Sequence, residues 1–364
     1  MKKTVIIRTA AALLAAVLLY PCQADAISAR KAILVDGQTG RVLYEKQADD
    51  RSLIASTTKI MTAMIVCRHC CVLDQVTIPR EAVGIEGSSM YLQEGERLTV
   101  QELLYGLMLS SGNDAAVALA IYCGGTVEAF VEMMNKEATV LGLTNTHFAN
   151  PHGLDAPEHY SSARDLAILA SCAMTDPIFA KTVATKCVRV GQRSLTNHNK
   201  LLWQTEGIDG VKTGFTKAAG RILVSSAMRN GRRLVCVTID DGNDWKDHKA
   251  LYDQGFTDFQ QTQLVQAGQN MGSVFVFSGE ETMVGVAAQE DFSFAVAPGE
   301  TVSFLLPVKE FVYAPVVEGA SAGYAYICID GKAVGKVPIV YEATVELRPQ
   351  EKKRFWNKMF GGKT

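Results

Sequence analysis

The chain changes character near residue 260, and this change limits the possible folds more than any other feature. From residue 31 to 257, stretches with the helical spacing of apolar residues alternate with short apolar stretches typical of strands. From about 264 to 347 the helical spacing disappears and only short strand-like stretches follow one another. Alternation of this kind predicts an α/β domain, and a run of short strands predicts an all-β domain. We therefore expect two domains with a boundary near 258–264.

Short patterns in the first domain, which we place at 27–260, predict individual elements. Thr99 and Glu102 stand three residues apart ahead of an apolar stripe, which is the capping box of a helix start. Ser162 and Asp165 form a looser capping box. An Asn-Gly pair at 230–231 lies between two apolar stretches and is the strongest short signal for a strand hairpin. We therefore expect capped helices and a late hairpin.

The second domain, which we place at 261–347, is predicted to contain strands alone. The stretches typical of strands are 274–277, 292–296, 302–306, 324–329 and 337–345. Asp330–Gly331 predicts a tight turn between the last two. No group of side chains in this region suggests catalysis, so any chemistry is expected in the first domain.

The composition excludes several classes of protein. Of the 364 residues, 48% are hydrophobic and 20% are charged, and the formal net charge is −2. These proportions exclude a disordered chain, a collagen-like chain and a membrane protein with many spans. A net charge so close to zero gives no reason to expect nucleic acid as a partner.

The N-terminus has the pattern of a secretory signal peptide. Three basic residues precede the apolar run 9–20, and the small-residue motif Ala24-Asp25-Ala26 follows it. We expect residues 1–26 to be removed, and the protein to act at the outer face of the cytoplasmic membrane or in the cell wall. The apolar run is short for a transmembrane span. Cleavage as a lipoprotein before Cys22 is the less favoured alternative, because the three preceding residues lack the small side chains of such a site.

The C-terminal segment 348–364 combines six basic residues with one acidic residue. Phe355, Trp356, Met359 and Phe360 would form one apolar stripe on a helix, flanked by cations. Such a stripe can lie in a membrane interface that contains anionic lipid. We therefore expect a basic amphipathic tail that contacts the membrane surface, with a frayed basic tail as the alternative.

The nine cysteines suggest no metal site. The cluster Cys67-Arg68-His69-Cys70-Cys71 lacks a second pair at zinc-finger spacing. Eight cysteines would follow the signal peptide, and an even number in an exported protein suggests disulfides. Four of them lie in apolar contexts where single buried thiols are common: Cys123, Cys172, Cys236 and Cys328. The count is therefore also compatible with free thiols in a poorly oxidising habitat.

A first motif, Ser56-Thr57-Thr58-Lys59, stands at the start of a predicted helix. Residues three apart share a helix face, so Ser56 and Lys59 bring a hydroxyl next to an amine. A serine becomes a good nucleophile when a base takes its proton, and a lysine held neutral can be that base. The helix start also offers a backbone N–H for a developing oxyanion. Alone this motif is weak, because a helix-capping serine near a surface lysine is commoner.

Two further motifs become informative when they are considered together with the first. Ser111-Gly112-Asn113, between two predicted helices, offers a second hydroxyl for proton relay and an amide for a peptide-like substrate. Lys212-Thr213-Gly214, on a predicted strand edge, offers a cation and a hydroxyl for a carboxylate, and its glycine lets a substrate backbone approach the strand. Each is common by itself. Together with Ser56 and Lys59 they predict a single nucleophilic site.

The order S-x-x-K, S-x-N, K-T-G resembles the signature of penicillin-binding proteins and serine β-lactamases. More closely, the chain is similar to the low-molecular-mass D-alanyl-D-alanine carboxypeptidases over roughly residues 28–258. The stretches that carry this likeness are 55–63 (ASTTKIMTA), 150–155 (NPHGLD), 209–216 (DGVKTGFT) and 219–220 (AG).

The resemblance implies a fold and an activity. The fold is an α/β catalytic domain of the penicillin-binding protein/serine β-lactamase type, an antiparallel sheet flanked by helices, with a small all-β domain and an amphipathic tail. The activity is that of a serine-type D-alanyl-D-alanine carboxypeptidase, which removes the terminal D-alanine from peptidoglycan stem pentapeptides and so limits cross-linking. The implied partners are that stem peptide and the β-lactams that acylate the enzyme. No cofactor and no metal are implied.

The resemblance also implies roles for residues of the motifs. Ser56 attacks the bond between the two D-alanines, and Lys59 takes its proton. Ser111 helps to pass that proton to the departing D-alanine, and Asn113 holds the substrate amide. Water then hydrolyses the acyl-enzyme.

The strand motif is implied to bind the end of the substrate. Lys212 and Thr213 receive the terminal carboxylate beside Gly214. The backbone N–H groups of Ser56 and Phe215 form the oxyanion hole. Some relatives have histidine where Phe215 stands, so only the backbone role is carried over.

Two other functions are alternatives. A class A β-lactamase carries a deacylating glutamate in a loop, but the nearest string here, 132–135 (EMMN), lies inside a helical stripe. The middle motif is also Ser-Gly-Asn rather than Ser-Asp-Asn. The second alternative is a wall-binding, penicillin-sensing module that acylates without turnover, against which the intact set of motifs argues.

Overall fold

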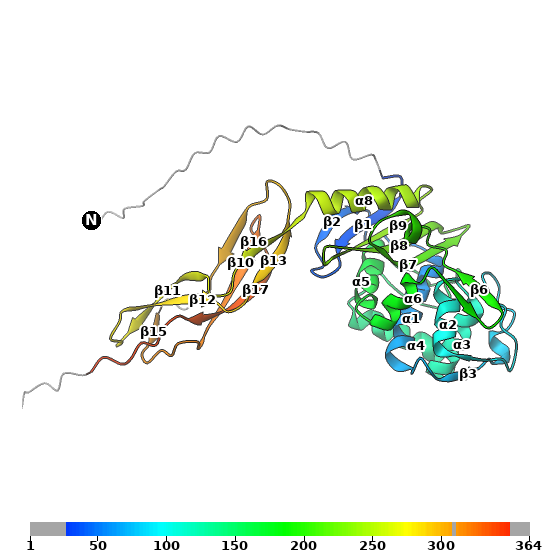
Figure 1. The fold of residues 1–364 in the computed structure, drawn as a ribbon, viewed down its shortest axis with the longest axis horizontal. Coiled ribbons are helices and arrows are strands. Elements are labelled where there is room, and N and C mark those ends of the chain that lie inside the picture. Colours follow the sequence, from blue (N-terminus) through cyan, green and yellow to red (C-terminus); the bar gives the residue numbers. More distant parts are fainter. Residues whose placement is uncertain (1–26, 308–310, 350–364) are drawn as a thin grey trace, which may run out of the picture.

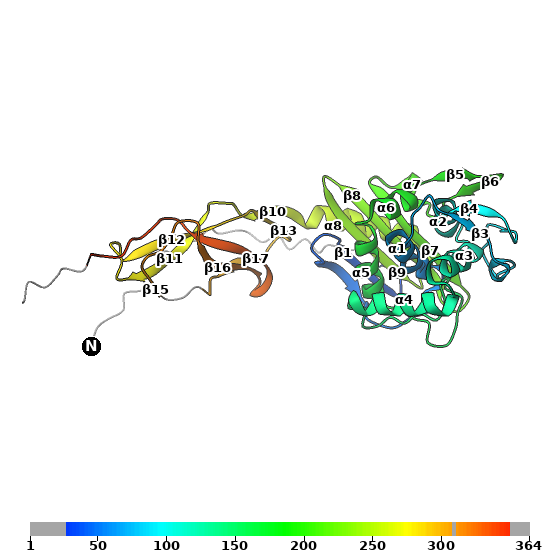
Figure 2. The same cartoon turned by 90° about the horizontal axis from the view of Figure 1, so that it is seen from below.

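The structure is a computed structural model, and it describes residues 27–307 and 311–349. Figures 1 and 2 show two bodies joined end to end, a larger one of helices and strands and a smaller one of strands. The helix α8 (Asp244–Asp258) of the larger body leads directly into strand β10 (Gln260–Val265) of the smaller one. The expected change from mixed α/β to all-β structure is therefore confirmed.

A five-stranded antiparallel sheet forms the centre of the larger body, in the order β2-β1-β9-β8-β7. In that order the strands span Val42–Lys46, Lys31–Asp36, Arg232–Ile239, Gly220–Arg229 and Ile208–Thr216. β1 pairs with β9, so the two ends of this domain meet in the middle of the sheet. β7 is an edge strand, which leaves its outer edge free to bind something else.

The predicted hairpin at the Asn-Gly pair is confirmed, and the sheet contains a second hairpin earlier in the chain. β1 and β2 pair across the turn at 37–41, and β8 and β9 pair across the Asn-Gly turn. Asn230 has φ 51° and Gly231 has φ 78°. Positive φ at both central residues is what a two-residue hairpin turn requires, which explains why Asn-Gly is such a strong signal.

Helices cover both faces of the sheet. α8 packs on one face with a small core that includes Tyr252 and Leu251. The other helices lie beyond the opposite face and enclose the main core (Figures 1 and 2). These helices are α1 (Lys59–His69), α2 (Val100–Met108), α3 (Asn113–Gly124), α4 (Val127–Val140), α5 (Ala163–Ala173) and α6 (Pro177–Ala184). The short α7 (Leu201–Gln204) lies against β7 instead. Two small two-stranded sheets complete the domain: β3 (Gln75–Thr77) with β4 (Arg97–Thr99), and β5 (Cys187–Val190) with β6 (Arg193–Thr196).

The two predicted capping boxes form to different extents. At α2, Thr99 Oγ1 accepts from the Glu102 N–H and the Glu102 carboxylate accepts from the Thr99 N–H, so the box is complete. At α5, Ser162 accepts from the Asp165 N–H. The Asp165 carboxylate instead accepts from Asn145 N–H at 2.7 Å. An aspartate is one carbon shorter than a glutamate, and here it ties a neighbouring loop to the helix start.

The smaller body contains β10 to β17. A six-stranded sheet has the order β14-β16-β17-β12-β11-β15, and β10 pairs separately with β13. These strands are β11 (Asn270–Phe277), β12 (Met283–Ala288), β13 (Phe292–Val296), β14 (Val302–Leu305), β15 (Phe311–Tyr313), β16 (Ser321–Ile329) and β17 (Lys332–Tyr341). All five predicted strands are present, and Asp330–Gly331 forms the turn between β16 and β17. Sequence patterns missed β10, β12 and β15.

The predicted signal peptide at 1–26 and nearly all of the predicted tail at 348–364 lie outside the described residues. Within the described part, no single helix is both long and apolar enough to cross a membrane, although two bent helix pairs, α3–α4 and α5–α6, reach that composition together. The eight cysteines from Cys67 onward are all unpaired.

His248 on α8 gives the fold a pH-dependent stability. Its ring lies between Ser225 Oγ at 2.6 Å and Thr238 Oγ1 at 3.0 Å, and it is fully buried. Burial lowers the pKa of His248 from 6.5 to about 3. The unfolded chain therefore binds a proton below about pH 6.5 that the folded chain rejects. Stability is complete above that pH and is lost progressively as the pH falls toward 3.

We expect the free energy of unfolding to fall between pH 7 and pH 5, with His248 alone contributing about 2 kcal/mol of the loss. Urea unfolding at the two pH values measures this loss in the free energy of unfolding. His248→Gln should show a smaller loss than the wild-type protein. Equal losses in both proteins would contradict the assignment.

Candidate active site

The nucleophile candidate Ser56 lies in a tight turn. The 3₁₀ turn Ala55–Thr58 runs directly into α1. Thr57 and Thr58 donate their hydroxyls to Ile54 O and Ala55 O, at 2.6 and 2.9 Å, which fixes the turn. A side-chain carbon at Gly153 would lie 1.9 Å from Ala55 O. The glycine of the Asn-Pro-His-Gly stretch is therefore needed for the loop to support this turn.

Lys59 is fully buried and its Nζ has three oxygen neighbours. They are Ser56 Oγ at 2.9 Å, Asn113 Oδ1 at 2.7 Å and the backbone oxygen of His152 at 2.6 Å. Burial, with the positive charge of Lys212 as a second cause, holds the pKa of Lys59 well below its usual 10.5, although the Asp114 carboxylate acts in the opposite direction.

The same three contacts allow Lys59 to act as a base when its amine is neutral. A neutral lysine has two N–H groups and one lone pair. Asn113 Oδ1 and the His152 carbonyl can only accept, so they take the two N–H groups. The lone pair is left for the Ser56 hydroxyl, whose proton it can remove. The geometry therefore supports Ser56 and Lys59 as the candidate nucleophile and its candidate base.

Asn113 connects the base to a loop that borders the site. Besides accepting from Lys59, its Nδ2 donates to Glu86 O at 2.5 Å, and its N–H donates to Ser88 O at 2.7 Å. Each end of the amide keeps one further hydrogen or lone pair for a ligand. The neighbouring Asp114 is buried and accepts from three backbone or hydroxyl groups of residues 89–92, which fixes this loop.

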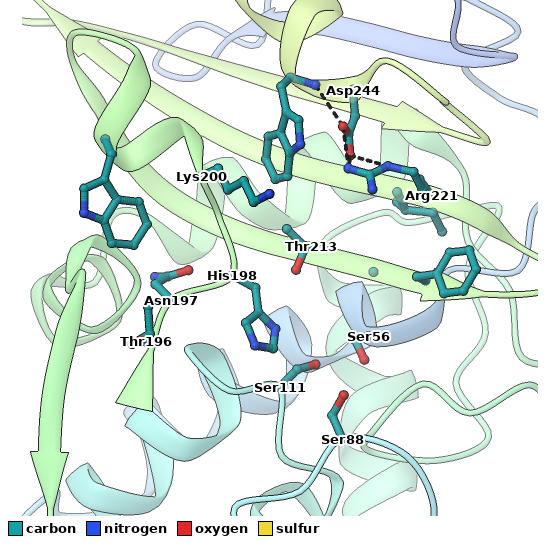
Figure 3. A pocket seen from close by; sticks show the side chains of 15 residues that line it. Ser56, Ser88, Ser111, Thr196, Asn197, His198, Lys200, Thr213, Arg221 and Asp244 are labelled. Carbon is teal, nitrogen blue, oxygen red and sulfur yellow. Dashed lines mark hydrogen bonds and ion pairs between the residues drawn. The ribbon is translucent and has the colours of Figure 1, made fainter. Parts of the chain in front are cut away.

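Two further hydroxyls lie near that of Ser56. Figure 3 shows the side chains of Ser56, Ser111 and Ser88 pointing toward one another. Ser111 has φ 60°, and it stands in the loop between α2 and α3 where the sequence places it. Ser88 was not predicted, because nothing in its local sequence distinguishes it from a surface loop.

The edge strand β7 passes beside the Ser56 turn. A side-chain carbon at Gly214 would lie 3.2 Å from Ile54 O and 3.3 Å from Ser56 N, so glycine allows this close approach. Thr213 and Gly214 line the open cleft, and Phe215 is 64% exposed beside them. The strand motif and the helix motif thus meet at one place.

Lys212 is in a different position from its two neighbours. Its side chain is buried, and Nζ donates to Thr213 O at 2.9 Å. Burial lowers the pKa of Lys212 to about 7. Lys212 therefore stabilises the backbone of β7 through this hydrogen bond, and its positive charge helps to lower the pKa of Lys59.

The cleft has a volume of about 740 Å³ and extends well beyond the predicted residues. Its further lining comes from the segment after β6, from α7, and from the junction of β8 with α8 (Figure 3). The lining residues that the motifs did not predict include His198, Lys200, Trp203, Arg221, Asp244 and Trp245. They come from segments without a recognisable motif, although Arg221 directly follows the Ala219–Gly220 stretch.

Comparisons with known proteins agree with this arrangement. Residues 20–243 match the family model described as D-alanyl-D-alanine carboxypeptidase, and residues 259–347 match the C-terminal domain of penicillin-binding protein 5. The chain is 32% identical to the D-alanyl-D-alanine carboxypeptidase DacF of Bacillus subtilis, over 85% of this chain and 84% of that protein. It is 33% identical to DacC of Escherichia coli, over 89% of this chain and 86% of that protein.

A solved structure has a similar fold over both bodies. Penicillin-binding protein 5 from Haemophilus influenzae superposes with a TM-score of 0.75 and 32% identity, covering 88% of this chain and 98% of that one. The similarity therefore includes the catalytic and the all-β domains together.

Proposed function

The chain belongs to the D-alanyl-D-alanine carboxypeptidase family, and we propose that Ser56 is the nucleophile with which it cleaves its substrate. It is a serine D-alanyl-D-alanine carboxypeptidase that acts on peptidoglycan stem peptides and binds β-lactams. The observation that carries the assignment of Ser56 is its 2.9 Å contact with the buried Lys59.

Acylation begins when Lys59 removes the Ser56 proton and Ser56 Oγ attacks the carbonyl between the two D-alanines. The backbone N–H groups of Ser56 and Phe215 stabilise the oxyanion that forms. Lys59 then returns the proton, through Ser111, to the amine of the departing D-alanine. The proton that Lys59 gains in the first step is held while the negative oxyanion is nearby.

Substrate binding uses the edge strand and the amide of Asn113. An extended peptide can pair with the free edge of β7, where Gly214 leaves room for a close approach. Thr213 donates a hydrogen bond to the terminal carboxylate. The buried Lys212 attracts the same carboxylate by its positive charge. Asn113 holds the substrate amide with the donor and acceptor positions that Lys59 and Glu86 leave open. Water attacks the acyl-enzyme after D-alanine has left.

The most direct test offers the protein a peptide ending in Lys-D-Ala-D-Ala beside a chromogenic β-lactam. We expect D-alanine release with slow β-lactam turnover. Rapid β-lactam hydrolysis without D-alanine release would indicate a β-lactamase. Labelling by penicillin without any D-alanine release would indicate a penicillin-sensing module.

Location follows from the substrate and from the two ends of the chain. Peptidoglycan lies outside the cytoplasmic membrane, which fits an extracellular or periplasmic protein. Residues 1–26 act as the export signal in our proposal, and the tail at 348–364 holds the mature protein at the membrane surface. Two sequence patterns support these assignments. The first is an A-x-A motif after an apolar run, and the second is a basic segment with four large apolar side chains.

Removing residues 348–364 is expected to release the protein from membranes. The apolar stripe and the basic residues supply the membrane affinity together, so deletion should move most of the protein to the soluble fraction. Fractionation of cells expressing the two forms measures this, and D-alanine release should be unaffected. Unchanged partitioning would count against the tail.

A further inference from the structure

The cleft contains two exposed cations that the predicted set of residues does not use. A substrate that ends in D-Ala-D-Ala presents a free carboxylate. Lys212, the cation of the strand motif, is buried and directs its ammonium group to Thr213 O. Among the described residues that line the open cleft, the lysine and arginine side chains are Lys200 and Arg221. The carboxylate therefore has two exposed cations available besides the buried one.

Arg221 stands beside the part of the strand where the carboxylate is expected. On β8 it lies directly opposite Phe215, and Thr213 pairs with Leu223 two residues along. Residues in this diagonal relation lie about 7–8 Å apart, which an arginine side chain can span. Figure 3 shows the Arg221 guanidinium in the same cleft as the Thr213 and Ser56 side chains.

Asp244, in the first turn of α8, fixes the orientation of this guanidinium. Arg221 Nη2 lies 2.7 Å from both oxygens of Asp244, and Nε lies 3.2 Å from Oδ2. Asp244 is buried, and its Oδ1 also accepts from the Trp245 N–H at 2.9 Å. The Trp245 ring centroid is 5.6 Å from Arg221 Cζ. The side chain is therefore held in place before a ligand arrives, which lowers the entropy lost on binding.

One edge of the guanidinium is left for a ligand. The pair with Asp244 uses Nε and Nη2. No hydrogen bond from Nη1 is described, and the Arg221 side chain is 45% exposed although its partner is buried. Nη1 carries two N–H groups that can donate to an anion. An arginine also keeps its charge at every physiological pH, whereas burial lowers the pKa of Lys212 to about 7.

We propose that Arg221 is the residue that binds the terminal carboxylate of the substrate, with Thr213 donating beside it and Asp244 positioning the guanidinium. This inference rests on the proposed function, because it assigns the end of the same substrate. Arg221, rather than Lys212, then supplies the positive charge that contacts the carboxylate. Lys212 stabilises the strand through its hydrogen bond to Thr213 O. Specificity for a free C-terminus then depends on the junction of β8 and α8.

The test compares a peptide ending in Lys-D-Ala-D-Ala with the same peptide carrying a C-terminal amide. In Arg221→Gln, kcat/KM for the free acid should fall roughly 10- to 100-fold, the range for a lost charge-assisted hydrogen bond. Turnover of the amide should change less than about threefold, because it offers no anion. Arg221→Lys should recover part of the lost activity, since lysine restores the positive charge but not the planar arrangement of N–H donors that a guanidinium offers.

Arg229→Gln is the matched control. Arg229 also lies on β8, pairs with an aspartate of α8 (Asp253) and stacks on an α8 aromatic ring, but it is outside the cleft. Its removal should leave both substrates unaffected. Equal losses for acid and amide in Arg221→Gln would overturn the proposal, and so would a selective loss in Lys200→Gln instead.

A failure of the proposed function would look different. The wild-type protein would then release neither D-alanine from the free acid nor D-alaninamide from the amide. The role of Arg221 is still decided in that case by the rate at which benzylpenicillin, compared with its methyl ester, acylates the protein. Loss of the preference for the free acid in Arg221→Gln supports the proposal, and an unchanged preference contradicts it.

Discussion

Replacing Ser56 by alanine is expected to abolish both D-alanine release and covalent labelling by penicillin. The variant keeps the cleft and the base but has no oxygen that can form the acyl-enzyme. The loss should be on the order of 10⁵-fold or more, the scale seen when a serine nucleophile is removed. The measurement is D-alanine release from a Lys-D-Ala-D-Ala peptide, with labelling by a fluorescent penicillin in parallel.

The fold of the Ser56→Ala variant should be intact. The hydrogen bond described for the Ser56 hydroxyl is the one to Lys59, and the surrounding turn is fixed by Thr57 and Thr58. A thermal unfolding curve close to that of the wild-type protein is the control. Retention of more than a small fraction of the labelling would place the nucleophile elsewhere.

Replacing Lys59 by methionine has the second-largest expected effect. Methionine has a similar length and fills the buried space, but it cannot accept the Ser56 proton. Removing a general base typically costs 10²- to 10⁴-fold, and here the same residue also returns the proton to the leaving group. We therefore expect acylation by penicillin to slow by roughly 10³- to 10⁴-fold.

The pH dependence distinguishes a base from a structural lysine. Burial and the nearby charge of Lys212 lower the pKa of Lys59 well below 10.5. In the wild-type protein the acylation rate should rise with pH as Lys59 loses its proton, and level off once it is neutral. The methionine variant should lack that rise. Lys59→Arg should be as slow as Lys59→Met, because an arginine stays protonated. Rapid acylation in Lys59→Arg would contradict the role of base.

The sequence predicts the fold best where a short local pattern strongly favours one backbone conformation. Asn230 and Gly231 both adopt positive φ, which Asn-Gly allows at little cost. Thr99 and Glu102 close the complete capping box of α2. Strand β10 was missed because four of its six residues, QQTQLV, are polar and exposed, so it shows no apolar pattern. β15 was missed because three residues are too few for any period to show.

The candidate site is predictable only where its chemistry is concentrated in short motifs. Ser56 and Lys59 are neighbours on one turn, so their contact follows from their spacing. The burial of Lys212 does not, because it depends on the elements that cover β7. Arg221 faces the cleft through its pairing with Asp244 on α8, a contact made only when the sheet and the helix have packed. Tertiary packing therefore determines which cations reach the substrate.

The central claim is that D-alanine leaves as an acyl-enzyme forms on Ser56. Acid quenching during turnover of a Lys-D-Ala-D-Ala peptide, followed by digestion and mass spectrometry, tests it directly. We predict D-alanine in solution and the mass of the remaining acyl group on the peptide that contains Ser56. Released D-alanine with the acyl group on any other residue would contradict the account, and so would a penicillin adduct on Ser56 with no release of D-alanine.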